Sequence, residues 1–162
     1  MILLVAAVAV AGIEWRHDAA LSRTAARERA VRTTAGELAQ ALLSYNATNL
    51  DASRARVLAL STATFAANYN QDFTQALAGT ITALHASASA TVRDVYTADV
   101  SASAAKAIVV VDFQTKSSAG TRQVLGTSLQ MDLVRQGTWK VNDVSVVSAQ
   151  SETQTPTTTP KP

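Results

Sequence analysis

Cysteine is absent from the 162-residue chain, and histidine occurs only twice. Without cysteine the chain has no disulfide framework, no thiolate nucleophile and no cysteine-based zinc or iron–sulfur site. Two histidines leave room only for a metal site dominated by carboxylates. We therefore expect neither a metal nor an organic cofactor.

An excess of charge of one sign is also missing. The chain has 14 lysines and arginines against 12 aspartates and glutamates, a net charge of +2, and 5% aromatic residues. A dedicated nucleic-acid-binding protein needs a dense cationic face, so we expect no nucleic-acid partner. The length favours one domain with short appendages.

The long apolar run that a membrane-spanning helix needs is present only in part. Residues 1–13, MILLVAAVAVAGI, carry no charge and precede Glu14, Trp15, Arg16 and His17, a pattern typical of a membrane–water boundary. As a helix this run extends about 20 Å, whereas the hydrocarbon core is about 30 Å thick. We interpret residues 1–17 as a transmembrane segment whose first residues are missing. A short anchor, a cleaved signal peptide and a buried helix are the alternatives.

Helical periodicity follows this segment. Val31, Ala35, Leu38, Leu42 and Tyr45 recur at steps of three and four within a predicted helix over residues 18–45. Its first half, residues 18–35, has few large apolar groups and is predicted as a helical stalk. Further helices are expected over residues 51–69 and 72–88.

The third predicted helix has its own pattern and cap. Asp72 is its expected N-cap, and four apolar residues share one stripe along it. These residues are Phe73, Leu77, Ile81 and Leu84.

Past residue 90 the apolar residues alternate and β-branched residues become frequent, which is typical of strands. Strands are predicted over residues 91–101, 107–115, 122–135 and 138–147, with a hairpin loop at 117–120 and a bulge at Asn142–Asp143. Helices followed by antiparallel strands indicate an α+β domain over residues 36–148, with helices packed on a curved sheet. Residues 149–162, rich in threonine and proline, are predicted to be disordered.

Candidate chemical groups are few. His17 and His85 have no carboxylate or nucleophile near them in the sequence, and no phosphate-binding loop or nucleophile elbow occurs. Asp94 shares its strand parity with Tyr96 and Val100, so it faces either a cleft or solvent, and solvent is favoured because isolated buried carboxylates are costly.

Several segments resemble the Mce-associated (mammalian cell entry-associated) membrane proteins of actinobacteria. The similar segments are Trp15–His17, Ala41–Asn46, Leu50–Ala52, Arg54–Leu58, Phe65, Tyr69, Val109–Thr115 and Leu129–Val141. The resemblance implies a single-pass membrane protein whose C-terminal domain lies outside the cytoplasm and has a nuclear transport factor 2-like cone shape. Asn46 replaces the acidic or aromatic residue usual in the family.

The resemblance further implies a non-catalytic accessory subunit that stabilises an Mce-type lipid importer, with the membrane and importer subunits as partners and no small-molecule ligand. Two alternatives remain. One is a ligand-binding or enzymatic cone fold with a pocket formed by Tyr45, Tyr69 and Asp94. The other is a scaffold subunit of a secretion or conjugation machine.

The partner surface is predicted separately from the pocket. We expect it at the arginine-rich stalk, on Arg23, Arg27 and Arg29, together with the exposed face of the sheet. The expected orientation, with the C-terminal domain outside the cytoplasm, conflicts with the positive-inside rule. That rule would keep the arginines after the apolar run in the cytoplasm unless the missing N-terminal flank were more basic.

Overall fold

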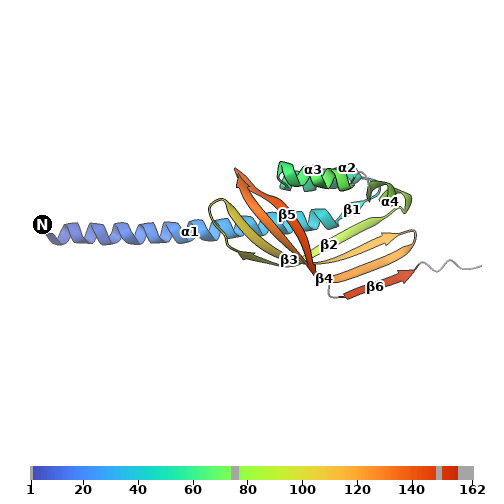
Figure 1. Cartoon of the computed structure of the whole chain (residues 1–162). Helices are drawn as coiled ribbons and strands as arrows, with labels where there is room; N and C mark the ends of the chain where they lie inside the picture. Colours follow the sequence, from blue (N-terminus) through green and yellow to red (C-terminus); the bar gives the residue numbers. More distant parts are fainter. Residues whose placement is uncertain (1, 74–76, 149–150, 157–162) are drawn as a thin grey trace, which may run out of the picture.

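Helices pack against a curved antiparallel sheet, the α+β arrangement predicted from the sequence (Figure 1). The computed structural model describes the backbone of residues 2–73, 77–148 and 151–156 and, from residue 22, most side chains. The elements in chain order are α1 (Ile2–Leu43), β1 (Tyr45–Asn46), α2 (Leu50–Leu60), α3 (Ala63–Asp72), α4 (Ala78–Ala83), β2 (Ser87–Ala98), β3 (Ala104–Ser117), β4 (Gly120–Gln136), β5 (Thr138–Ser148) and β6 (Ser151–Pro156).

The C-terminal half of α1 crosses the concave face of the sheet. Val31, Ala35 and Leu38 of the predicted stripe are fully buried, so the core begins within the segment predicted as a stalk. The helix ends at Leu43 because the next residues join the sheet. Ser44 Oγ accepts a hydrogen bond from the backbone N–H of Ala90 (3.1 Å), and Tyr45 pairs with Ala88.

The N-terminal half of α1 continues beyond the sheet as a rod (Figure 1). No helix in the described part of the chain is long and apolar enough to cross a membrane. The interpretation of residues 1–17 as part of a transmembrane segment stays a prediction. The side chains of Trp15 and His17 lie outside the described residues.

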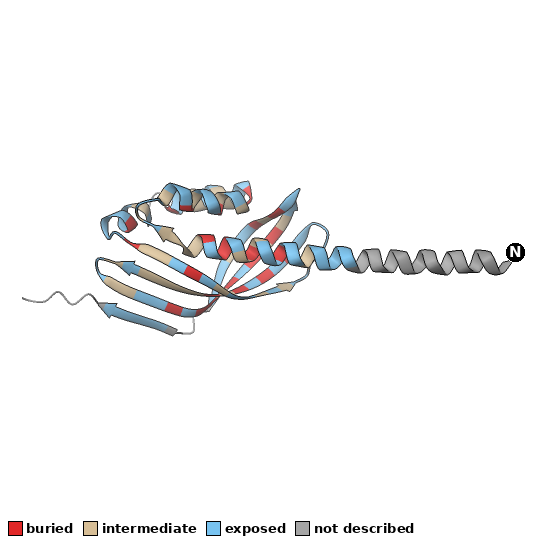
Figure 2. Cartoon of the chain, turned by 180° about the vertical axis from the view of Figure 1, so that it is seen from behind, coloured by how far each residue is buried: buried red, intermediate tan, exposed pale blue. Residues whose placement is uncertain are grey.

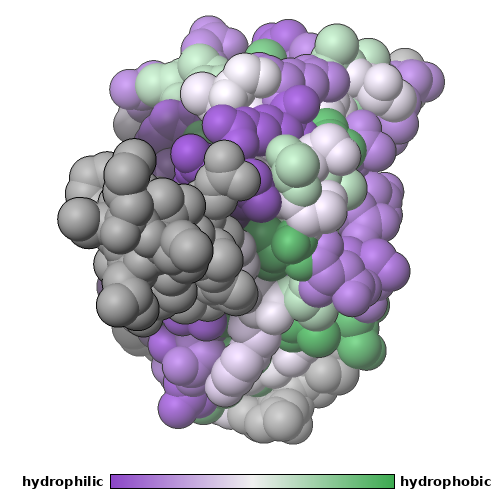
Figure 3. Space-filling view, turned by 90° about the vertical axis from the view of Figure 1, so that its left-hand side faces the viewer, coloured by the Kyte–Doolittle hydropathy of each residue, from purple (hydrophilic) through white to green (hydrophobic). Residues whose placement is uncertain are grey.

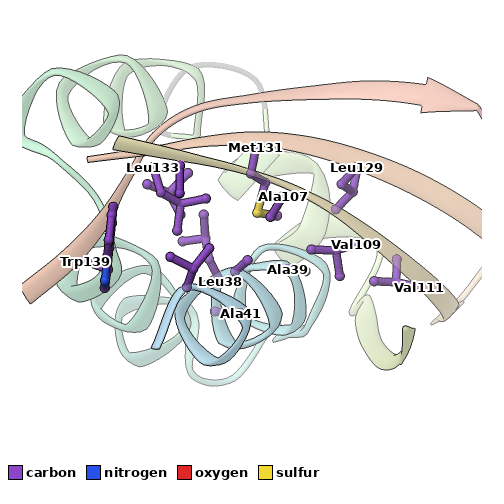
Figure 4. Close-up of a cluster of buried hydrophobic side chains, with 14 of the residues drawn as sticks. Leu38, Ala39, Ala41, Ala107, Val109, Val111, Leu129, Met131, Leu133 and Trp139 are labelled. Carbon is purple, nitrogen blue, oxygen red and sulfur yellow. The ribbon is translucent and has the colours of Figure 1, made fainter. Parts of the chain in front are cut away.

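The core is a layer between α1 and the middle strands. Leu38 and Ala39 of α1 face Val109 of β3 and Met131 of β4, and Trp139 of β5 closes one end (Figure 4). These side chains are at most 6% exposed. Burying one valine, leucine or methionine side chain stabilises a fold by roughly 1.5–3 kcal/mol. Figure 2 shows that the buried residues of α1 lie in the part of the helix that crosses the sheet.

The sheet has more strands than predicted. Its order is β1-β2-β3-β4-β5, with β6 also paired to β4. The predicted hairpin at residues 117–120 is confirmed. In the turn that joins β4 to β5, Gly137 has φ +76°. The predicted bulge is confirmed too, because Asp132 pairs with Asp143 and Leu133 with Val141, which leaves Asn142 unpaired.

Irregularities in three neighbouring strands coincide and bend the sheet. The pairing shifts around Arg93 in β2 and around Asp112 in β3, and Gly126 of β4 has φ +64°. The Asp112 carboxylate accepts a hydrogen bond from the N–H of Gly126 (2.8 Å) and lies 3.7 Å from the Arg93 guanidinium. Extra residues in a strand increase its bend and twist, so this cluster fixes the curvature.

The predicted single helix over residues 51–69 is wrong, since α2 and α3 are separate. Ser61 forms a bridge with Val141 of β5, and the N–H of Thr62 donates to the Val141 carbonyl (2.9 Å). Thr62 Oγ1 then accepts from the N–H of Phe65 (3.3 Å) and caps α3. Contact with a distant strand replaces the helical hydrogen bonds at this point.

The predicted helix over residues 72–88 is also wrong in its extent. Asp72 ends α3 instead of capping a new helix, and α4 spans six residues. Of the predicted stripe, Phe73 and Ile81 are buried, whereas Leu77 and Leu84 are 48% and 37% exposed. The chain from Ser87 onward pairs with β3, and these nonlocal hydrogen bonds override the helical propensity of its alanines.

Three aromatic rings form a row along α3. The Tyr69 ring lies 6.4 Å from that of Phe65 and 5.5 Å from that of Phe73. Arg54 of α2 donates from Nε to Asn70 Oδ1 (2.6 Å), which joins α2 to α3. Burial raises the pKa of Tyr69 above 10.0, and the nearby Arg54 charge opposes the rise.

The predicted disordered tail is wrong for Ser151–Pro156, which form β6. β5 pairs with residues 128–136 of β4. On the same edge of β4, beyond the bend, residues 120–125 have no partner from β5 and pair with β6 instead. Arg122 and Glu152 join the two strands through contacts of 2.8 and 3.0 Å. The composition of residues 151–156 did not predict this strand, because the strand forms only by pairing with an edge of β4 about 30 residues earlier in the sequence. Residues 149–150 and 157–162 lie outside the described residues.

Tyr69→Phe should reduce the loss of stability at alkaline pH. Since the pKa of Tyr69 is raised in the folded state, the folded chain binds the phenol proton where the unfolded chain has released it. Stability is therefore unaffected below about pH 10 and falls as the pH rises above it. Urea unfolding at about pH 8 and about pH 11 measures the effect. The control Tyr96→Phe, at a ring 59% exposed, should leave the loss unchanged; equal behaviour of both variants would contradict the assignment.

Glu152→Gln should make β6 separate from β4 more often without unfolding the domain. The Arg122–Glu152 pair is about half exposed, so its loss should change the free energy of unfolding by at most about 1 kcal/mol. Cleavage within residues 151–156 by a nonspecific protease should become faster, as followed by mass spectrometry. Glu37→Gln, an exposed glutamate on α1, is the control, and equal cleavage rates in the two variants would argue against the pairing.

Candidate functional site

The structure brings together two of the three residues predicted to form a pocket. Tyr45 of β1 and Tyr69 of α3 both pack against the small cluster of Phe73, Ile81 and Ala86. Asp94 is exposed on β2 and pairs in register with Val110. A pocket that combines Tyr45, Tyr69 and Asp94 is therefore not formed.

The irregularity at Arg93 explains the position of Asp94. With strict alternation, Val92 and Asp94 would share one face of the sheet and Val95 would lie on the other. Instead, Val92 and Val95 both pack against the core beside Gly36 of α1. The extra residue between them turns Asp94 outward together with Tyr96, in agreement with the solvent-facing alternative.

A polar groove lies where α2 begins, next to β1 and the adjoining ends of β2 and β3. Its volume is about 580 Å³, within the range of small-molecule sites. Tyr45 lines it, together with Arg56, Lys116 and several serine, threonine and amide side chains, and none of its lining residues is acidic. Sequence reasoning missed this groove because its wall comes from four segments, none of which carries a motif.

A second groove, of about 660 Å³, lies between α1 and the β4–β5 turn. Two of the three arginines predicted as a partner surface, Arg23 and Arg27, line it. Arg135 at the end of β4 joins them, whereas Arg29 is exposed elsewhere on α1. Figure 3, which looks at the molecule from the N-terminal end of α1, shows both hydrophilic and hydrophobic residues on this end of the domain.

The outer face of the sheet carries the other predicted surface. Tyr96 of β2 and Ile108 of β3 lie opposite each other and are 59% and 43% exposed. Val146 and Val147 at the end of β5 are also exposed, at 68% and 60%, but Val146 pairs with the buried Leu129 and so lies on the side of the sheet that faces the core. More than half of a folded protein's surface comes from apolar atoms, so we assign no ligand to the small exposed pair of Tyr96 and Ile108.

Groups with catalytic or metal-binding chemistry are not brought together in the described part of the chain. His85 is exposed, has φ +48° and follows the last turn of α4, as expected for a helix end. No group of three histidine, aspartate or glutamate side chains that could hold a metal ion occurs among the described residues. The expected lack of a cofactor stays a prediction.

No family model matches the chain, and no curated protein matches it. Membership of the Mce-associated family therefore stays a prediction. Several solved structures share the fold. An IcmL-like type IV secretion system protein of Legionella pneumophila superposes with a TM-score of 0.54 at 13% identity, over 82% of this chain and 94% of that chain.

Two further structures agree with the first. CagV of Helicobacter pylori, a VirB8 homologue of its type IV secretion system, gives a TM-score of 0.54 at 12% identity over 75% of this chain and 99% of that one. The periplasmic domain of DotI gives 0.57 at 15% identity over 72% and 92%. At these identities the comparisons establish the fold, a cone in which helices cover a curved sheet.

The comparisons correct the functional expectation. The chain is similar in structure to components of type IV secretion systems, among them the soluble domain of TrwG from Bartonella grahamii. The predicted accessory role in an Mce-type importer is therefore wrong, and the alternative of a secretion-machine scaffold agrees better with the findings. The functional expectation depended on what a family resemblance implies, and proteins of one fold can have different functions.

Proposed function

We propose that this chain is a non-enzymatic assembly subunit of a type IV secretion-type machine, and that its folded domain acts outside the cytoplasm through contacts with other subunits. The observation that carries the proposal is the extent of the match. The chain covers 94%, 99% and 92% of three structures, two of which are described as type IV secretion system proteins. A match of this extent includes the helices as well as the sheet.

The arrangement of α1 supports an assembly role. Its C-terminal half is part of the core, while its N-terminal half continues as a rod away from the domain. One continuous helix without a break can hold the domain at a fixed distance from whatever its N-terminal half contacts. At about 1.5 Å per residue, the twenty residues before Ser22 extend about 30 Å.

The chemistry of the described residues supports binding over catalysis. The polar groove at Tyr45 contains arginine, lysine, hydroxyl and amide groups, with no acidic side chain to act as a general base. The arginine-lined groove also has no acidic side chain among its lining residues. Both grooves are suited to holding another molecule and lack a nucleophile–base pair. The DotI domain is described as periplasmic, which supports a position outside the cytoplasm for this domain.

The proposal predicts that this chain co-purifies with secretion-machine subunits. The full chain, tagged at its natural locus, is extracted from crosslinked membranes, and its partners are identified by mass spectrometry. We expect the machine's ATPases and envelope subunits among the enriched proteins, and their abundance should fall in a deletion strain and return on complementation. An unrelated envelope protein with the same tag is the control. Enrichment of lipid-importer subunits without secretion subunits would contradict the proposal.

A further inference from the structure

The groove between α1 and the β4–β5 turn concentrates positive charge. Arg23 and Arg27 are one helical turn apart on α1, and Arg135 approaches from the end of β4. Like charges four residues apart destabilise a helix by a few tenths of a kcal/mol. A third arginine from another element adds to this repulsion, so the arrangement calls for a compensating anion.

No protein group supplies that anion within the described residues. None of the residues that line the groove is aspartate or glutamate. The ion pairs found in the described part of the chain are Arg93–Asp112 and Arg122–Glu152, which involve other arginines. Among the residues whose side chains the structure describes, the three guanidinium groups of the groove therefore have no carboxylate partner, and an external anion can bind them.

The shape of the groove suits a polypeptide. α1 contributes small side chains between and beyond the arginines, Ala26 and Ala30 among them, and the opposite wall contains Gly137. Trp139, 6% exposed, lines the groove as well. Small walls allow a backbone to come close. From Arg23 to Thr34 the groove follows α1 for about 16 Å, which equals about five residues of extended chain.

We propose that this groove binds an acidic segment of a partner subunit, whose carboxylates pair with Arg23, Arg27 and Arg135 and whose apolar side chains contact Trp139 and the alanines. Guanidinium groups bind carboxylates through two parallel hydrogen bonds, which orients the partner as well as holding it. This inference rests on the proposed function in one respect, that the partner is a protein of the same assembly.

A lipid headgroup is the less favoured occupant. Arg23 lies ten residues, or about 15 Å, beyond Ile13, the last residue of the uncharged N-terminal run. Attraction to a charged membrane surface falls off over about 8 Å at physiological salt. The groove is also elongated and partly apolar, unlike a site for a single phosphate. The test therefore compares binding of the acidic peptide with binding of phosphatidylglycerol vesicles.

The test measures binding of a fluorescent peptide that alternates glutamate with leucine to the full chain, by anisotropy. The triple variant Arg23→Gln, Arg27→Gln and Arg135→Gln should bind at least about tenfold more weakly, since it loses the charge-assisted hydrogen bonds. The matched control Arg29→Gln, Arg32→Gln and Lys106→Gln removes the same charge from exposed positions outside the groove. It should stay within about twofold of the unmodified chain.

Three results would overturn the proposal. One is an equal loss in both triple variants, which would indicate an effect of net charge. Another is equal binding of a peptide with glutamine in place of glutamate. The third is binding of phosphatidylglycerol vesicles that depends on the groove arginines when the acidic peptide does not bind. Circular dichroism checks that both variants keep the fold.

A cellular arm separates this proposal from the assembly role. A photo-crosslinker at Thr138, which lines the groove, should capture a segment containing several carboxylates, whereas one at Ala119 in the distant β3–β4 turn should not. Capture of a segment without acidic residues at Thr138 would contradict the groove proposal. If secretion subunits co-purify equally with both triple variants, the groove proposal fails alone. If the peptide binds as expected but secretion subunits never co-purify, only the proposed function fails.

Discussion

The hydrogen bond from the N–H of Gly126 to the Asp112 carboxylate holds the point at which the sheet bends, and the rest of the architecture depends on that bend. Irregularities at Arg93, Asp112 and Gly126 lie side by side across β2, β3 and β4, so the three strands curve together. The glycine is needed here because its φ of +64° is a conformation that other residues adopt at a cost. The concave face created by the bend receives α1, and the bend divides β4 between β5 on one side and β6 on the other.

The same curvature positions the two grooves at opposite ends of the packed part of α1. The polar groove lies where α1 ends and β1 begins, whereas the arginine-lined groove lies where α1 meets the β4–β5 turn. The bulge at Asn142 holds the intervening helices in place. Thr62 Oγ1 donates a hydrogen bond to Asn142 Oδ1 (3.1 Å), and Lys140 Nζ donates one to the Ala59 carbonyl near the end of α2. A lysine at a helix C-terminus also interacts favourably with the helix dipole.

Local patterns predicted the elements whose residues carry their own signal. The stripe of Val31, Ala35 and Leu38, the alternation along β4, and the bulge at Asn142 could all be derived from spacing. The elements that were predicted wrongly have another feature in common, because each of them depends on a partner distant in the sequence. Thr62 interrupts a helix because Val141 offers a carbonyl, and residues 151–156 form a strand because β4 has an open edge. Arg23 and Arg27 could be proposed as a surface from sequence, but the contribution of Arg135 required the fold.

The chain combines a helical rod with a cone-shaped domain, and two grooves without acidic residues lie on the described part of that domain. The measurement that tests this account most directly is electron cryomicroscopy of the native complex isolated through this chain. The account predicts a secretion-type assembly in which the cone is seated against other subunits, with partner density along α1 beside Arg23, Arg27 and Arg135. A lipid-importer complex, or a cone whose arginine-lined groove faces open solvent in a complete assembly, would contradict it.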